Sequence, residues 1–172
     1  MAEGLKILVT GGAGYVGSVL VPVLLEEGYE VTVLDNFMYG QTSLLSCCYR
    51  QELKIVRGDV RDEQLVKKLV SGHDVILPLA CLTGAPACQA NPILAEQVNL
   101  EAIRMLLRWR SKHQMVIFPT TNSGYGIGQE GIFCTEETPL RPVSLYGRLK
   151  VKAEKAIMDA GNSIALRLAT AF

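Results

Sequence analysis

The 172-residue chain has 49% hydrophobic residues and a formal net charge of zero, with 17 basic and 17 acidic residues. So apolar a composition excludes a disordered chain, because it can bury enough surface to offset the loss of chain entropy. The balanced charge provides no electrostatic field that would attract nucleic acid or an anionic membrane, so we expect the protein to bind neither.

Cysteine and histidine content bears on redox state and metal binding. The five cysteines form no CxxC pair, and an odd count does not indicate a disulfide framework. With only His73 and His113 as partners, no metal site is expected. No apolar run is long enough to span a membrane, and the start does not resemble a signal peptide. We therefore expect free thiols and a cytoplasmic protein.

The first 34 residues predict a βαβ unit. An apolar run at 5–10 indicates a strand and leads into a glycine cluster at 11–17. Helical spacing comes next at 16–27, with Gly28 as its C-cap, and 30–34 is a second apolar strand. Strand, glycine turn, helix and strand succeed one another within about 30 residues, as in a βαβ unit.

The same alternation continues to the end of the chain. Further helices are predicted at 41–51 (a weak pattern), 62–70, 93–110 (after a helix start at Asn91-Pro92) and 145–159, and further strands at 54–56, 74–79, 115–118 and 163–168. Continuous Val, Ile and Leu runs are typical of a parallel sheet covered on both faces. We therefore predict an α/β, doubly wound, Rossmann-type fold of three αβα layers with strand order 3-2-1-4-5-6.

The segment 124–143 contains many Gly and Pro residues and has no clear period. We expect it to form a long loop at the C-terminal edge of the sheet. Ligands of open α/β sheets bind at that edge, and long irregular loops in compact domains are often functional.

The glycine cluster has the spacing of a dinucleotide-binding turn. Gly11 would allow a tight turn out of the strand, Gly14 would let the backbone approach a pyrophosphate, and Gly17 would let the helix pack closely on the sheet. Backbone N–H groups at the helix N-terminus would then meet the phosphate charge. The pattern alone is weak, but here it comes after a strand and opens a helix, which is the context that supports it.

Two acids stand after the second and third strands. Asp35 could accept hydrogen bonds from both adenosine ribose hydroxyls and would repel a 2′-phosphate, which favours NAD over NADP. Asp59 could meet the adenine amino group. The alternative is that both are ordinary turn or helix-start residues.

Tyr146 and Lys150 are four residues apart on a predicted helix and therefore share one face. A free tyrosine, with a pKa near ~10, is a poor base at neutral pH, but a nearby ammonium lowers that pKa. The pair could then exchange a proton with a sugar hydroxyl while NAD exchanges hydride. A YxxxK pattern also occurs by chance, so it gains weight only beside the glycine turn and Asp35.

Hydroxyl groups come after the fifth strand in the segment 119–126. Thr121, with Ser123 as a second possibility, could bond the reacting oxygen and orient it toward Tyr146. The alternative is a turn that uses these hydroxyls locally.

Together these segments resemble the extended short-chain dehydrogenase/reductases, the NAD-dependent epimerase/dehydratase family. The matching pieces run in the family's order: TGGAGYVGS at 10–18, LDN at 34–36, GDVRD at 58–62, PLACLTG at 78–84, Asn99 in VNL, TTNSGYG at 120–126, YGRLK at 146–150 and LRLATAF at 166–172.

The resemblance implies NAD as the cofactor, a nucleotide sugar as the substrate, and a set of site residues. It assigns Gly11, Gly14, Tyr15, Val16 and Gly17 to the pyrophosphate, Asp35 and Asn36 to the adenosine ribose, Asp59 and Val60 to the adenine, Leu79, Ala80, Cys81 and Thr83 to the nicotinamide side, Asn99 to that loop or the cofactor, and Thr121, Tyr146 and Lys150 to a catalytic triad of which Tyr146 and Lys150 also touch the cofactor.

Two departures from the family narrow the expected activity. Family dehydratases typically carry Thr-Asp-Glu where this chain has Thr121-Asn122-Ser123, so the acid and base for eliminating water are missing and an epimerase is favoured. The alternatives are a sugar ketoreductase or dehydrogenase, and a non-catalytic NAD-binding regulatory protein. Cys81 stands where the family often has a small residue, and it could be an inert buried thiol.

Residues 1–172 are expected to form one NAD-binding domain that carries the catalytic residues. Family members usually continue beyond the sixth strand, so we expect most of the substrate-binding part to be absent and the fragment alone to be inactive. Members often dimerise through two helices, which correspond here to 93–110 and 145–159. The alternative is that the apolar residues of helix 93–110 only cover the sheet.

Overall fold

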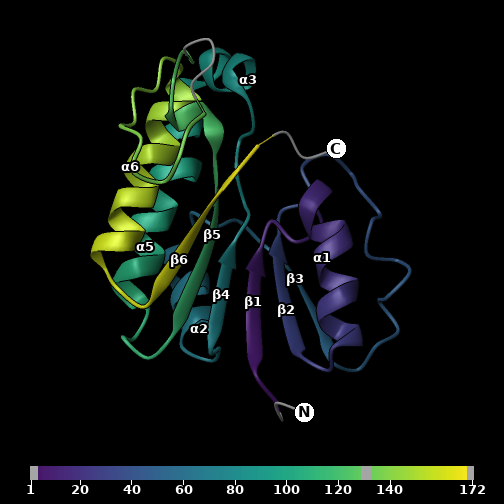
Figure 1. Ribbon diagram of the computed structural model, residues 1–172. Coiled ribbons are helices and arrows are strands. Elements are labelled where there is room, and N and C mark those ends of the chain that lie inside the picture. Colours follow the sequence, from purple (N-terminus) through teal and green to yellow (C-terminus); the bar gives the residue numbers. More distant parts are fainter. Residues whose placement is uncertain (1–3, 129–132, 170–172) are drawn as a thin grey trace.

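A computed structural model describes residues 4–128 and 133–169 of the chain. The described strands form one parallel sheet in the order β3-β2-β1-β4-β5-β6, which confirms the predicted doubly wound topology (Figure 1). The strands are β1 (Lys6–Thr10), β2 (Glu30–Asp35), β3 (Leu53–Arg57), β4 (Val75–Pro78), β5 (Met115–Thr121) and β6 (Ser163–Leu168).

Helices lie on both faces of this sheet and make the three layers of the fold. On one face lies α1 (Tyr15–Glu26); on the other lie α2 (Glu63–Val70), α5 (Ala102–Trp109) and α6 (Leu145–Asp159) (Figure 1). Successive side chains of a strand point to opposite faces of the sheet and so contribute to two hydrophobic cores, one on each face. In β1, Ile7 and Val9 pack toward α1, while Leu8 between them packs on the opposite side. Burying each such side chain contributes about 1.5–3 kcal/mol, so both layers stabilise the sheet.

The predicted helix at 41–51 is wrong. That segment forms a series of turns, in which Leu45, Cys47 and Arg50 each donate a backbone hydrogen bond to the residue three before it. Its polar groups bond to the α1 region instead: Ser43 Oγ donates to the Ala13 carbonyl at 2.6 Å, and Arg50 donates to the last turn of α1. These tertiary bonds outweigh a weak helical pattern.

The predicted helix at 93–110 is present but irregular. It consists of α4 (Pro92–Glu96), a π-helical segment η1 (Gln97–Glu101) and α5, and it begins, as predicted, after Asn91, whose side chain accepts from the Leu94 N–H. A short helix that was not predicted, α3 (Ala85–Ala90), precedes it. Single π-helical turns are often found at functional sites.

The last strand, β6, lies at the edge of the sheet and has one poorly covered face. Ile164, Leu166 and Leu168 are between 37% and 46% exposed. The predicted loop at 124–143 has no long helix or strand in its described residues, apart from the 3-10 turn η2 (Asn122–Gly124) that ends within it; residues 129–132 lie outside the described part.

Candidate cofactor and active site

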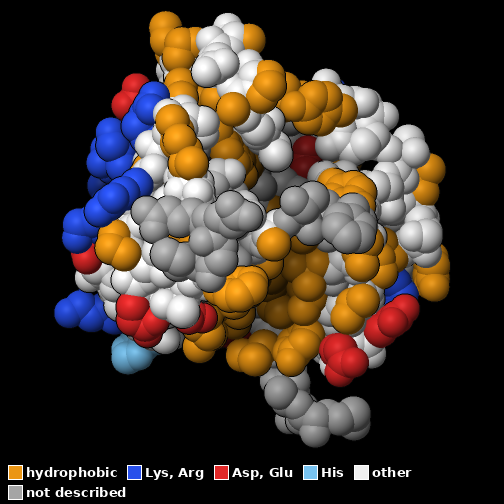
Figure 2. Space-filling model, turned by 45° about the horizontal axis from the view of Figure 1, so that its top comes forward, with side chains coloured by type: hydrophobic (Ala, Val, Ile, Leu, Met, Phe, Trp, Pro, Cys, Tyr) orange, Lys and Arg blue, Asp and Glu red, His pale blue; other side chains and the backbone are white. Residues whose placement is uncertain are grey.

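A cleft of about 700 Å³ lies at the C-terminal ends of the strands. Its walls come from the turns after β1, β2, β3, β4 and β5 and from the first turn of α6. Figure 2 looks partly down on this edge and shows a central hollow bordered largely by hydrophobic side chains. The site is therefore where the topology of an open α/β sheet places a ligand.

Two positions of the glycine turn must be glycine because another backbone segment lies too close for a side chain. Gly11 has a φ of 69°, and a Cβ there would lie 2.5 Å from the backbone nitrogen of Ala80. A Cβ on Gly17 would overlap the backbone of Gly12, so helix α1 can pack this closely only on a glycine. Side chains at these two positions would displace both walls of the cleft.

The N-terminus of α1 opens into the cleft without a capping side chain. Gly14 is the N-cap residue, no side chain accepts a hydrogen bond from the first turn, and that turn carries no acidic residue. The first N–H groups of a helix need an acceptor, and the helix dipole favours a negative one. The turn therefore fits the pyrophosphate of a dinucleotide, which would accept from these groups.

Asp35 lies at the end of β2 and is 7% exposed. Its carboxylate accepts from the N–H of Ala13 in the glycine turn at 3.0 Å and from the N–H of Phe37 at 2.8 Å. The acid therefore connects the glycine turn to the loop after β2. Its carboxylate lines the cleft next to Asn36, where a ribose would lie beyond the pyrophosphate.

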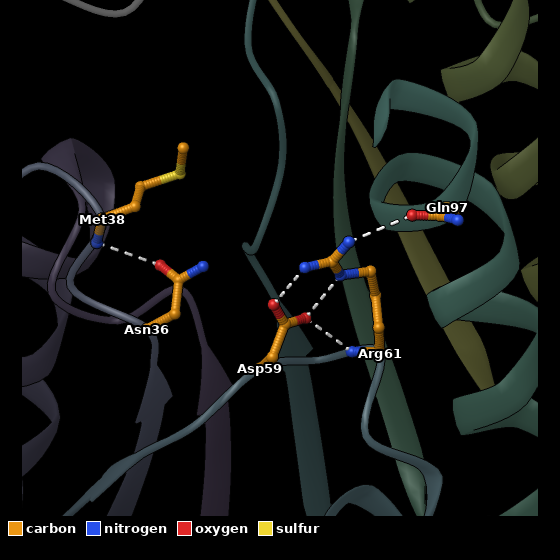
Figure 3. Close-up of polar contacts among 5 residues, drawn as sticks. All are labelled: Asn36, Met38, Asp59, Arg61 and Gln97. Atoms are coloured by element: carbon orange, nitrogen blue, oxygen red, sulfur yellow. Dashed lines mark hydrogen bonds and ion pairs between the residues drawn. The ribbon is translucent and has the colours of Figure 1, made fainter. Parts of the chain in front are cut away.

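Asp59, after β3, is held by an arginine that the sequence analysis did not single out. The Arg61 guanidinium donates to both carboxylate oxygens of Asp59, at 2.9 and 2.7 Å, and to Gln97 Oε1 at 3.0 Å (Figure 3). The Arg61 side-chain hydrogen bond is the main reason that the pKa of Asp59 lies below its usual value. Asp59 therefore stays a carboxylate, which only accepts hydrogen bonds.

Asn99 braces the loop after β4. It is 2% exposed; its side chain accepts from the Leu82 N–H at 2.8 Å and donates to the Leu82 carbonyl at 2.9 Å. Asn99 thus fixes the loop that carries Cys81 and Thr83, and it contributes to the site through that loop because its own side chain does not line the cleft.

Thr121, Tyr146 and Lys150 meet at the β5 end of the cleft. Tyr146 and Lys150 come from the first turns of α6, one turn apart, as the spacing predicted. The Lys150 ammonium, in a side chain that is 6% exposed, donates to the Pro119 carbonyl at 2.7 Å and lies 3.9 Å from the centre of the Phe118 ring. Thr120, beside them, has a buried hydroxyl without a hydrogen-bond partner among the described residues.

The protonation states at this end are set mainly by burial. Burial, and next the charge of Cys81, raise the pKa of Tyr146 to about 12, whereas the Thr121 hydroxyl lowers it. Burial also lowers the pKa of Lys150 and raises that of Cys81. Tyr146 is therefore a protonated phenol at neutral pH. Lys150 was expected to lower the pKa of Tyr146, but it is not among the groups that shift this pKa.

The cleft brings together nearly all the residues predicted for the site. Those that line it are Gly11, Gly14, Tyr15, Val16, Gly17, Asp35, Asn36, Asp59, Val60, Leu79, Ala80, Cys81, Thr83, Thr121, Tyr146 and Lys150. Ser123 does not line it: the residue is exposed, and its backbone N–H donates to Thr121 Oγ1 at 3.1 Å because η2 turns the chain away.

Several cleft residues were not predicted, among them Met38, Gln41, Arg61, Leu94 and Val98. Only Arg61 carried a usable signal, since it stands two residues after Asp59 in the segment GDVRD. In the described part of the chain, no helix is long and apolar enough to cross a membrane, and no group of His, Cys, Asp and Glu side chains could hold a metal.

Comparison with known proteins identifies the chain's relatives. The family model described as "NAD dependent epimerase/dehydratase family" matches residues 7–171. The chain belongs to this family. The predicted resemblance is thereby confirmed, and NAD, the predicted cofactor, is the cofactor of this enzyme family.

Individual members of the family extend the comparison. The UDP-glucose 4-epimerase of Halalkalibacterium halodurans is 34% identical over 155 residues, which are 88% of this chain and 45% of that protein. The dTDP-glucose 4,6-dehydratase of Streptomyces niveus is 32% identical over 160 residues, 87% of this chain and 47% of that protein. The chain spans about half the length of the curated relatives it matches.

Solved structures of the family share the fold. The UDP-Glc/GlcNAc 4-epimerase of Campylobacter jejuni has a TM-score of 0.83 and 30% identity, covering 91% of this chain and 49% of that chain. The UDP-glucose 4-epimerase of Thermus thermophilus, in complex with NAD, has a TM-score of 0.82 and 29% identity, covering 95% of this chain and 54% of that chain. The chain is thus a member of a nucleotide-sugar epimerase and dehydratase family.

Proposed function

We propose that this chain is the cofactor-binding part of an NAD-dependent nucleotide-sugar epimerase. The observation that carries the proposal is the convergence of Thr121, Tyr146 and Lys150 at one end of a cleft that has the glycine turn at its centre and Asp35 beyond it. The relatives that are 4-epimerases of UDP-sugars support the substrate class.

The chemistry of the proposal assigns one proton path to the chain's own side chains. When bound, NAD would supply the acceptor and donor of hydride for the reacting sugar carbon. Tyr146 exchanges the proton of the sugar hydroxyl, and the Thr121 hydroxyl orients the reacting oxygen. With its pKa raised to about 12, Tyr146 is a phenol that can donate to a keto sugar; to accept a proton from a sugar hydroxyl, it would need its pKa lowered, and the nearby Lys150 ammonium is the cation that could do so.

The two residues after Thr121 favour epimerisation over dehydration. Asn122 and Ser123 are exposed and offer neither an acid nor a strong base for removing water. Returning the hydride to the other face of the sugar needs no such group, so the hydroxyl, tyrosine and lysine suffice.

We also propose that the nucleotide-sugar pocket comes mainly from residues outside these 172, because the relatives are about twice as long. The cofactor test uses the chain as it is. Calorimetry should show that NAD binds and that NADP binds much more weakly, and Asp35→Ala should remove the preference. If NADP binds as well as NAD, the assignment of Asp35 to the ribose is wrong.

The activity test uses the protein together with its substrate-binding part. UDP-glucose and UDP-galactose should interconvert without net NADH formation, and Tyr146→Phe should abolish turnover while NAD still binds. Stoichiometric NADH release would indicate a dehydrogenase or ketoreductase instead. Full activity in Tyr146→Phe would contradict the proposed proton path.

A homodimer through the helix at 92–109 and α6 belongs to the same proposal. Ile103, Met105 and Leu106 cover the sheet, and Lys and Arg side chains gather on the side of the molecule where α6 lies (Figure 2). A partner would have to meet these charges, so the association constant of the dimer should depend on the salt concentration. Sedimentation that shows only monomer at micromolar concentration would exclude it.

A further inference from the structure

Arg61 is partly exposed, yet its side chain makes three hydrogen bonds to other side chains that line or border the cleft. It lies in the loop between β3 and α2, and its side chain is 43% exposed. Exposed ion pairs contribute only about 0–1 kcal/mol to stability, so a structural role alone explains little of this arrangement. The bidentate geometry instead fixes direction, because the planar guanidinium and the planar carboxylate align edge to edge.

The contacts leave one defined acceptor on Asp59. Its two oxygens have about four lone-pair positions. Oδ1 accepts from the backbone N–H and the Nε of Arg61, both at 2.9 Å, and Oδ2 accepts from Nη2 at 2.7 Å. The Asn36 side chain also lowers the pKa of Asp59 by hydrogen bonding, so a ligand donor at the remaining position on Oδ2 would share or replace that contact.

Gln97 holds the guanidinium from the opposite side. Its Oε1 accepts from Arg61 Nη1 at 3.0 Å, and it belongs to the π-helical segment η1, 36 residues further along the chain. Arg61 is thus fixed between two elements, while the amide nitrogen of Asn36 points toward Asp59 from the end of β2 (Figure 3). The Asp59 carboxylate therefore cannot turn away unless one of these contacts breaks.

The sheet order places this acceptor at the far end of a bound dinucleotide. The reacting side chains lie beyond β4 at β5, the glycine turn comes after β1, and Asp35 ends β2. A ligand with its pyrophosphate at α1 and its reactive ring beside Tyr146 therefore extends its other base over β3. Asp59 lies just after β3, so this base meets its carboxylate.

We propose that Arg61, anchored by Gln97, is a positioning residue that aims the Asp59 carboxylate at the distal base of the cofactor and so selects a base with an exocyclic amino group. The inference rests on the proposed binding of NAD and deepens it. Adenine offers an amino donor at this position, whereas hypoxanthine offers a carbonyl oxygen, which a carboxylate repels. Hypoxanthine also carries a hydrogen on N1, but that donor lies at a different position from the amino group, so the site should bind the hypoxanthine dinucleotide more weakly than NAD.

The test compares NAD with nicotinamide hypoxanthine dinucleotide by calorimetry on the chain as it is. Wild type should prefer NAD by about tenfold or more, since a buried or aimed polar group left unpaired is costly. Arg61→Met and Arg61→Lys should both reduce the ratio of the two affinities several-fold; lysine keeps the charge but lacks the planar fork. Gln97→Ala should reduce it less, and Asp59→Asn, which can donate, should bring it close to one.

The matched control is Arg104→Met, which removes an exposed arginine that pairs with Glu101 at 2.7 Å and does not line the cleft. Its ratio should equal that of wild type. If wild type binds NAD but does not discriminate, or if both Arg61 variants keep the wild-type ratio, the inference is wrong while the proposed function stands. If wild type binds neither dinucleotide, the proposed function fails, and the inference fails with it.

Discussion

Replacing Asn99 with leucine should cost this chain a large part of its stability. The side chain is 2% exposed, and leucine has nearly the same size, so the substitution removes hydrogen bonds without opening a large cavity. Two bonds to Leu82 are lost, at 2.8 and 2.9 Å. Each is worth about 1 kcal/mol net, and the Leu82 N–H then remains buried without an acceptor, which costs about 1–3 kcal/mol more.

The expected loss is therefore about 3–5 kcal/mol, out of the roughly 5–15 kcal/mol that is typical of folded domains. Urea unfolding followed by circular dichroism would measure it, and the melting temperature should fall by about 6–20 °C in a chain of this length. Asn122→Leu is the control, because Asn122 is exposed and its change should stay within about 0.5 kcal/mol. A loss in Asn99→Leu no larger than in the control would refute the reasoning.

Three further results are expected. Gly17→Ala should weaken NAD binding and lower stability because its Cβ overlaps the turn, whereas Gly72→Ala, whose Cβ would make only ordinary contact, should leave both unchanged; equal effects would contradict the packing argument. Burial raises the pKa of Tyr146 to about 12 from an ordinary 10.0, so between these pH values the folded state keeps a proton that the unfolded chain loses. The free energy of unfolding should therefore fall as the pH rises from 10.0 to about 12, and Tyr146→Phe should lack this part of the fall. Identical pH profiles for the two proteins would contradict the raised pKa. Glu154→Gln should cost about 3 kcal/mol in thermal or urea unfolding, because it breaks a largely buried pair with Arg167 at 2.7 Å, and a loss below about 1 kcal/mol would show that the pair is not needed.

The sheet could be predicted because its information is local. Continuous apolar runs mark each strand. The positions of Gly11 and Gly17 between a strand and a helix predict a tight turn and close helix packing. The Tyr146 and Lys150 pair was also correctly placed on one helix face, since a spacing of four fixes that face in any α-helix.

The remainder depends on contacts between distant segments. The segment 41–51 has a weak helical pattern, but its bonds to the α1 region decide its form. Spacing could place Lys150 near Tyr146, but it could not show that the ammonium bonds to Pro119 and that burial dominates the pKa of the tyrosine. The partner of Arg61 is 36 residues away at Gln97, so no local pattern could reveal it.

The π-helical segment between α4 and α5 has a consequence for the rotational phase of the whole helix. Leu94 and Val98 face the cleft, while Ile103 and Leu106, further along the same helix, are buried against the sheet. A wider turn between the two parts lets each keep its own phase, because it absorbs an additional residue without moving either end. Deleting one residue within 97–101 should therefore convert this turn to an ordinary α-helical one, and both ends of the helix would keep their faces. The same deletion within α5, which has no such additional residue, would rotate the residues that follow by about 100° and turn part of the apolar face away from the core.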